Sequence, residues 1–233
     1  MSKIVYWAPY LENDEHDWNI LFNEPINLHK ENIEKNKTNF DSNSRLKRVL
    51  LCPASNQLNK STFVFTNPLE TELEIKEGDI VYKSKNYYES YITDIQGLFN
   101  YGLPVIMFCD EDLEVTITSP YTSYCPHLQY ASLIPGKFNI GKWFRPINFE
   151  YKFHKDKYFK INKDEHLAYF NFNTSEDIIM KRFKMNDNLL KIAKTCSTSP
   201  VWEKFVPLVD RYKRFVNSQT NKMVSKEIKR NII

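Results

Sequence analysis

Three residues at metal-binding spacing are the first feature of this sequence that could support chemistry. His154 and Asp156 form a His-x-Asp pair, and His166 follows twelve residues later. Side chains two residues apart on a strand point to the same face, and two histidines with one carboxylate hold Fe(II) in non-haem oxygenases. His154, Asp156 and His166 therefore define one alternative, an Fe(II)/2-oxoglutarate-type oxygenase. The competing interpretation is an exposed polar turn that binds no cofactor.

Nucleophilic catalysis has little support in the sequence. Cys125-Pro126-His127 places a thiol two residues from an imidazole, but catalytic partners usually come from distant segments, so a structural loop is favoured. The chain has no Gly-x-Ser-x-Gly motif, and its 5 glycines form no phosphate-binding cluster. The sequence thus identifies no catalytic residue and favours a protein that is not an enzyme.

The segment from Pro120 to Arg145 is rich in proline, aromatic and polar residues. A loop of this kind on a rigid β scaffold is a natural ligand-binding surface, with aromatic rings for stacking and an arginine for an anion. We take Tyr121, His127, Trp143 and Arg145 as the candidate ligand-binding residues. The alternative is structural, with Trp143 and its neighbour plugging one end of the fold.

The elements that would position these residues are mainly strands. Residues 3–8 read as a first strand, and the polar stretch that follows, to residue 47, reads as an irregular arm. From residue 48 the pattern becomes β, and Gly, Pro and Asn separate short strands in the manner of a sandwich or barrel. The expected strands are Arg48 to Cys52, Ser61 to Thr66, Thr71 to Ile75, Ile80 to Tyr82, Leu113 to Thr118, Ile147 to Phe153 and Leu167 to Phe172.

Period-two alternation assigns the inner faces of these strands. From Ile147 to Phe153, four large apolar residues alternate with Asn, Glu and Lys, which is typical of a half-buried strand. In the last strand, Ala168, Phe170 and Phe172 form the expected inner face. A shift of one residue would bury the charges, so the pattern fixes the register.

After residue 180 the apolar period changes from two to that of a helix. Asn186 can cap a helix that runs to about Cys196, and Ser199-Pro200 can begin a second helix that kinks or restarts at Pro207. The basic end from Lys222 to Ile233 is expected to fray. The aromatic stripe of the second helix packs on its own domain or serves a protein partner or self-association.

Composition bounds the class of protein. The 233 residues carry a net charge of only +3, which argues against a nucleic-acid partner. The apolar runs are too short for a membrane span, and the first residues do not resemble a secretion signal. The 4 widely spaced cysteines indicate thiols rather than disulfides or zinc. A bias to lysine, asparagine and isoleucine suggests an AT-rich genome, as in many phages and some marine bacteria. The expected location is the cytoplasm, that of the host if the chain is phage-encoded, or the virion.

One stretch of the chain resembles a known group of proteins. A strand ending in Ser119-Pro120-Tyr121, a loop with Pro135-Gly136, and Trp143 leading into the strand that starts at Ile147 are similar to an uncharacterised family of bacterial and phage proteins. The similarity covers about residues 105–174. It implies a jelly-roll-like domain without an established activity.

Together these patterns predict a mainly β protein with three parts. Residues 1–47 form a first strand and arm, 48–180 an antiparallel jelly-roll-like sandwich, and 181–233 C-terminal helices. The leading functional hypothesis is a non-enzymatic binding or interaction protein. The alternatives are the oxygenase and a virion structural component whose arm and tail clasp neighbouring subunits.

Overall fold

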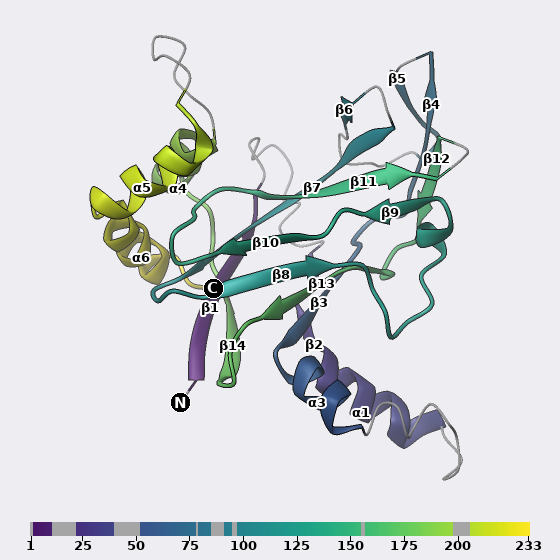
Figure 1. Cartoon of the computed structure of the whole chain (residues 1–233), viewed down its shortest axis with the longest axis horizontal. Helices are drawn as coiled ribbons and strands as arrows, with labels where there is room; N and C mark the ends of the chain where they lie inside the picture. The colour runs from purple at the N-terminus through teal and green to yellow at the C-terminus, as the bar shows by residue number, and fades with distance from the viewer. Residues whose placement is uncertain are drawn as a thin grey trace.

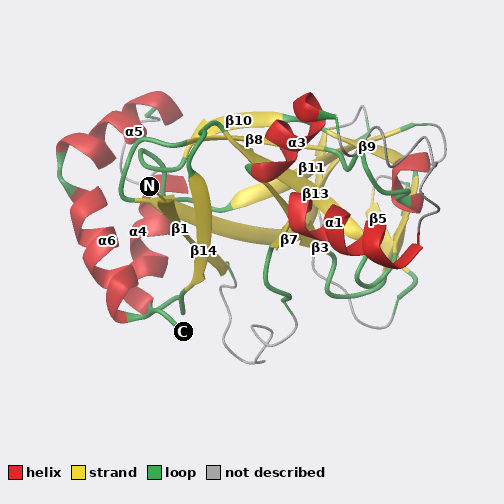
Figure 2. Cartoon of the chain, turned by 90° about the horizontal axis from the view of Figure 1, so that it is seen from below, coloured by secondary structure: helices red, strands yellow, loops and turns green. Residues whose placement is uncertain are grey.

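A computed structural model of the chain describes residues 2–10, 22–39, 52–77, 79–84, 91–94, 97–154, 157–197 and 206–233. It is mainly β, with helices at two separate places on the surface of the sheets (Figure 1, Figure 2). The strand expected from Arg48 to Cys52 falls almost entirely outside the described residues, as does the helix start expected at Ser199-Pro200.

The first sheet contains the N-terminal strand at an interior position. β1 pairs in parallel with β14 on one side and antiparallel with β7 on the other. β11 pairs with β7 and with β9, and β6 also pairs with β7. The strands of this sheet are β14 (Asp177–Arg182), β1 (Ser2–Pro9), β7 (Leu98–Cys109), β11 (Ile147–Phe153), β9 (Ala131–Leu133) and β6 (Tyr91–Asp94).

The second sheet is antiparallel throughout, and a small third sheet extends one end of the molecule (Figure 1). In order across the second sheet, the strands are β10 (Gly136–Asn139), β8 (Glu114–Thr118), β13 (His166–Phe172), β3 (Thr62–Thr66) and β2 (Ile26–Asn27). The third sheet consists of β12 (Tyr158–Ile161), β4 (Thr71–Lys76) and β5 (Asp79–Tyr82).

The main hydrophobic core lies between the two large sheets. Phe149 of β11 packs edge-on against Phe170 of β13 with ring centroids 6.0 Å apart, and Trp7 of β1 packs against Phe65 of β3 at 5.5 Å. The predicted alternation of β11 is confirmed, because its four apolar side chains are buried while Asn148 and Lys152 are exposed. Two β-sheets therefore face each other across an aromatic core, which confirms the mainly β class with C-terminal helices.

The stretch before residue 48 contains a helix that the sequence pattern did not indicate. α1 (Leu28–Asn39) and α3 (Pro53–Lys60) lie beside β3 on the outer side of the second sheet. Leu28 of α1 packs with Val64 and Tyr169, which are fully buried. β13 is therefore covered on both faces, whereas its sequence suggested only one inner face at Ala168, Phe170 and Phe172.

The C-terminal helices cover one end of the first sheet. α4 (Asp187–Ser197) begins as predicted, since the side chain of Asn186 accepts a hydrogen bond of 3.0 Å from the amide of Leu189. α5 (Leu208–Asn217) starts directly after Pro207, in agreement with the expected restart. The basic end is not frayed, because α6 (Thr220–Arg230) buries Val224 and Ile228 against the same cluster.

Other expectations from composition can be compared with the described residues. None of the helices there is both long enough and apolar enough to cross a membrane. The four cysteines are free thiols, of which Cys109, Cys125 and Cys196 are buried and Cys52 is exposed.

Candidate functional site

The four predicted ligand-binding residues lie at two ends of the sandwich. β8 leads to the loop that holds Tyr121, while β10 runs back toward the C-terminal helices and the loop that holds Trp143 and Arg145 (Figure 1). Tyr121 packs edge-on against Tyr169 and donates a hydrogen bond of 3.3 Å to Asn59. These residues therefore do not form a single binding surface.

Trp143 and Arg145 are packed against α5. The Trp143 ring lies 4.5 Å from the ring of Tyr212, and the Arg145 guanidinium lies over Trp143 at 4.9 Å. Burial raises the pKa of Tyr212 to about 12, against the opposing charge of Arg145. The packing is what the structural alternative describes, in which this part of the loop closes one end of the fold.

His127 belongs to a different environment, a buried cluster with Cys125 and Glu165. Donor atoms of the three side chains lie within 4.8 Å of one another. His127 is fully buried and Cys125 is 5% exposed. The imidazole Nδ1 lies 2.7 Å from Glu165 Oε1, and the backbone amide of His127 donates to the same oxygen at 3.1 Å. Cys125 and His127 adjoin because a 3₁₀ turn, η2 (Pro126–Gln129), begins directly after the cysteine.

Glu165 reaches this cluster from a tightly held turn before β13. Asp164 has a left-handed φ of 62°, and the backbone amide of Asn67 donates to the carbonyl of Glu165 at 2.8 Å. The backbone and side-chain amides of Asn162 donate to Glu165 Oε2 at 2.9 and 3.0 Å. Burial would raise the pKa of Glu165, but the hydrogen bonds from His127 and Asn162 outweigh it and lower that pKa below its ordinary value.

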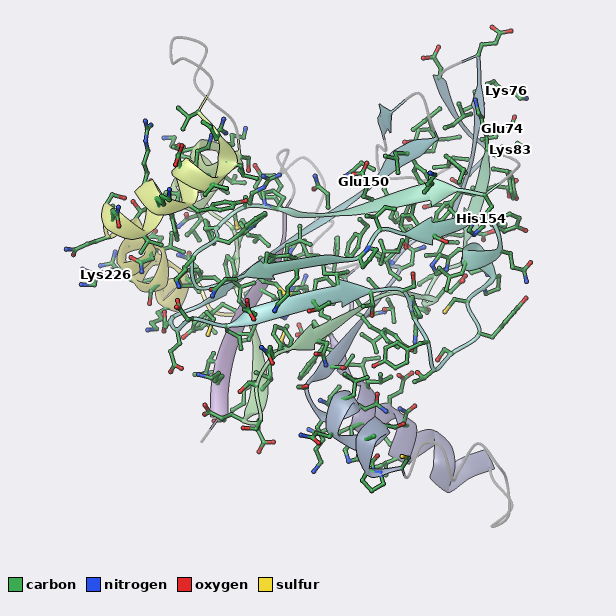
Figure 3. The ribbon with its side chains drawn as sticks, viewed as in Figure 1. Glu74, Lys76, Lys83, Glu150, His154 and Lys226 are labelled. Atoms are coloured by element: carbon green, nitrogen blue, oxygen red, sulfur yellow. The ribbon has the colours of Figure 1, made fainter. Side chains whose placement is uncertain are left out.

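The two histidines of the predicted iron site lie in separate hydrogen-bond networks. His154 Nε2 lies 3.2 Å from the carbonyl of Leu128 at the exposed end of β11 (Figure 3). His166 is buried under α1, with Nδ1 2.9 Å from the hydroxyl of Tyr169 and Nε2 3.0 Å from Glu31 Oε1. Asp156 lies outside the described residues, so the three-residue site stays a prediction.

A polar groove lies on the outer side of the second sheet. It has a volume of about 1130 Å³ and runs between α3 and the segment that joins β13 to β14. We call it the α3 groove. Its lining combines side-chain amides and hydroxyls with one lysine, two carboxylates and apolar residues such as the exposed Leu58. Its polar lining residues are Asn56, Gln57, Lys60, Ser61, Asn171, Asn173, Thr174, Ser175, Glu176 and Asp177.

Part of this lining is held rigidly. The side-chain amide of Asn171 donates to Thr62 Oγ1 at 2.8 Å and to the carbonyl of Leu58 at 3.2 Å, which fixes α3 against β13. Gln57, Ser175 and Asp177 are exposed at the rim. The groove is thus a pre-formed polar surface on a rigid scaffold, which suits ligand binding.

Sequence reasoning missed both Glu165 and the α3 groove. Glu165 stands in an ordinary charged turn, and the signal that it faces His127 exists only in the folded chain. The amides from Asn171 to Asn173 adjoin a predicted strand, but α3 was not predicted, so the opposite wall of the groove was missing.

The C-terminal helices use their apolar faces internally. Leu189 of α4, Phe215 of α5 and Ile228 of α6 are buried in one cluster with residues of β1 and β7. Val209 and Met223 are exposed on these helices, and Lys226 extends from α6 into solvent (Figure 3). Association with a partner through the helices stays a prediction.

Comparison with protein-family models, with curated proteins and with solved structures finds no match. The resemblance of residues 105–174 to a bacterial and phage family is therefore still a prediction, and a function for this chain must be inferred from its own residues.

Proposed function

We propose that this chain is a non-enzymatic binding protein, built on a jelly-roll-like β-sandwich, that holds a polar and uncharged ligand of the carbohydrate class in the α3 groove. The observation that carries this proposal is the lining of the groove, in which amides and hydroxyls outnumber charged side chains. The phage origin and the cytoplasmic or virion location indicated by the composition are part of the same proposal.

The chemistry of the lining favours hydroxyl groups on the ligand. An amide side chain offers both donors and an acceptor, and a hydroxyl offers both as well, so each can pair with a sugar hydroxyl. The lining carries one lysine, Lys60, and two carboxylates, Glu176 and Asp177, so it has no excess of positive charge for a phosphate or nucleic acid. A ligand with alternating donors and acceptors therefore fits the groove better than an anion does.

The size of the groove favours a chain of several sugar units. Sites for single small ligands span roughly 300–1,000 Å³, and the volume of about 1130 Å³ exceeds this range. Pro53, Ala54 and Leu58 are exposed on α3 and add apolar surface to the lining, on which a sugar face can rest.

A titration followed by amide NMR tests this proposal with three probes, maltohexaose, cellohexaose and chitohexaose. Binding of one of them should shift amide signals of 53–61 and 171–177. Ser175→Trp, which fills the groove, should weaken binding by about tenfold or more, and Gln57→Ala by about two- to tenfold, the worth of one hydrogen bond. Gln129→Ala, an exposed amide away from the groove, is the matched control and should bind as wild type does.

Two outcomes would contradict the proposal. The first is no shift with any of the three sugars up to about 1 mM, the weakest affinity that a specific site of this size should show. The second is a set of shifts outside the groove that Ser175→Trp leaves unchanged. Binding of a polar peptide at the same residues would mean that the groove is a binding site but that its ligand is not a carbohydrate.

A further inference from the structure

Cys125, His127 and Glu165 lie at the junction of η2 with the turn that precedes β13, away from the residues that line the α3 groove. Their backbone is held by hydrogen bonds that do not involve the side chains. The amide of Leu128 donates to the carbonyl of Cys125 at 3.1 Å, and the amide of Tyr130 donates to that of His127 at 3.0 Å. The three side chains are therefore positioned before any ligand arrives.

One polar atom in this cluster has no partner. Nε2 of His127 is buried and makes no hydrogen bond among the described residues. Buried side-chain nitrogens are nearly always paired, and leaving one unpaired costs free energy, so the exception requires an explanation. The ring is enclosed by Tyr151 and Phe159, each with its centroid 5.9 Å from that of His127, which offer it no hydrogen-bond partner there.

The surroundings of His127 are those of a histidine prepared for a metal ion. Metal-ligating histidines usually have the second ring nitrogen fixed by a carboxylate, and Glu165 Oε1 lies 2.7 Å from Nδ1. Glu165 is in turn fixed by both amides of Asn162. A thiolate and an imidazole nitrogen are both donors that suit Zn²⁺, and a carboxylate on the second ring nitrogen is the usual support for such an imidazole.

The same three residue types also form nucleophilic triads, but the burial of Cys125 argues against that role. A nucleophile must meet a substrate, and a thiol that is 5% exposed does not. An ion is much smaller than a substrate. The unpartnered imidazole nitrogen also has no function in a cluster that merely fills space.

We propose that Cys125, His127 and Glu165 form a mononuclear site for a divalent ion of the Zn²⁺ class. Cys125 and His127 supply sulfur and nitrogen donors, and Glu165 holds the imidazole through Nδ1. Binding releases the thiol proton of Cys125 and involves no oxidation or reduction. This site is independent of the α3 groove, so it goes beyond the proposed function and does not rest on it.

Cobalt titration of the full-length chain, stripped of metal by a chelator, tests this proposal. Co²⁺ replaces Zn²⁺ and reports a bound thiolate through charge-transfer absorption, while native mass spectrometry gives the stoichiometry. Wild-type protein should take up one Co²⁺, and Zn²⁺ should displace it. Cys125→Ser and His127→Gln should each weaken binding by about 100-fold or more, and Glu165→Gln by about 10- to 100-fold.

Two matched controls separate this site from other donors. Cys52→Ser removes an exposed thiol, and His154→Gln removes a histidine of the predicted iron site; both should bind Co²⁺ as wild type does. The absence of stoichiometric Co²⁺ uptake by the wild type would overturn the proposal. Charge-transfer absorption that survives in Cys125→Ser would overturn it too.

Wild-type protein also gives a readout that does not depend on the folding of any variant. Because an ion that binds only the folded chain stabilises it, Zn²⁺ should raise Tm in a concentration-dependent manner. Mg²⁺, which prefers oxygen donors, should leave Tm unchanged. A Tm that does not respond to Zn²⁺, or responds equally to Mg²⁺, would overturn the proposal even if every variant failed to fold.

Discussion

Two buried histidines of this protein lie close together in the fold and differ in how completely they are paired. His166 has a partner for each ring nitrogen, the Tyr169 hydroxyl on one side and Glu31 on the other. His127 has Glu165 at Nδ1 and, among the described residues, nothing at Nε2. Glu165 and His166 are consecutive, so one short segment serves both clusters.

This difference separates a structural histidine from a candidate ligand. The His166 network links α1 to β13 and continues to Thr122, whose hydroxyl lies 2.7 Å from that of Tyr169. Every ring nitrogen in it is used, as expected where the network holds elements together. The His127 cluster holds its loop equally well but leaves one nitrogen for an ion. Burial of a histidine therefore says less about function than the pairing of its two nitrogens does.

The substitution with the largest predicted effect disrupts the core between the two sheets, on which both histidines depend. Phe149→Asp buries an unpaired carboxylate between the sheets at a fully buried position, which costs several kcal/mol and is comparable with the whole stability of a domain. We expect an unfolded chain in far-UV circular dichroism. Asn148→Asp, on the exposed side of the same strand, is the control and should melt close to wild type. A folded Phe149→Asp with an unchanged Tm would mean that the core described between β11 and β13 is wrong.

Alkaline pH should destabilise the fold by ionising Tyr169 in the His166 network. Burial raises the pKa of Tyr169 to about 12, despite hydrogen bonds from Thr122 and Ser123 that lower it. The folded pKa lies above the unfolded value of about 10, so this contribution to stability is complete below pH 10 and is lost as pH rises toward 12. The loss should be about 2–3 kcal/mol. Urea unfolding at a series of pH values measures it.

Tyr169→Phe is the control for this pH dependence, because it removes this titrating group and should make the decline between pH 10 and pH 12 smaller than in wild type. The part that remains comes from other buried tyrosines whose pKa is raised, such as Tyr212 and Tyr151. The same decline in Tyr169→Phe as in wild type would show that Tyr169 titrates normally and is not buried as described.

A smaller effect distinguishes the two histidines directly. His166→Gln should destabilise the fold by about 1–3 kcal/mol, because Glu31 and Tyr169 lose a buried partner. Its Co²⁺ affinity should stay within about twofold of wild type, since its side chain makes no contact with the His127 cluster in the described interactions. Urea unfolding and cobalt titration give the two values. Loss of Co²⁺ binding in His166→Gln would show that the two clusters are coupled and that His166 is not purely structural.

The smallest predicted effect concerns thiol reactivity. Burial raises the pKa of the Cys196 thiol to about 11 and also raises the pKa of Cys109, and Cys125 is buried in its cluster. Alkylation of the native protein near pH 8, followed by peptide mass spectrometry, should therefore modify Cys52 first. Cys125 reacting as fast as Cys52 would place its thiol within reach of a substrate and favour a nucleophile over a metal ligand.

Sequence patterns predicted the elements that depend on local order. The alternation of β11, the inner face of β13 and the Asn186 cap of α4 are set by residues adjacent in the chain, and each is confirmed. α1 was missed because its sequence lacks a continuous apolar stripe; it contacts the core mainly through the fully buried Leu28. Tyr169 lies on the face of β13 that was expected to be exposed, and it is buried because α1 covers that face.

The candidate sites depend on contacts that no local pattern encodes. Cys125 and His127 were visible as a pair, but the carboxylate that orients the imidazole comes from a turn 38 residues later. The same reason explains why the predicted ligand-binding residues from Tyr121 to Arg145 do not form one surface. Tyr121 and Trp143 are close in sequence, yet β10 carries the second to the C-terminal helices, where it meets Tyr212.

The most direct test of this contrast is imidazole ¹⁵N NMR of wild-type protein with and without one equivalent of Zn²⁺. It reads each ring nitrogen of both histidines in a single sample. The account predicts that Zn²⁺ shifts the signals of His127 and leaves those of His166 where they were. Unchanged His127 signals in the presence of Zn²⁺, or a shift of the His166 signals instead, would contradict it.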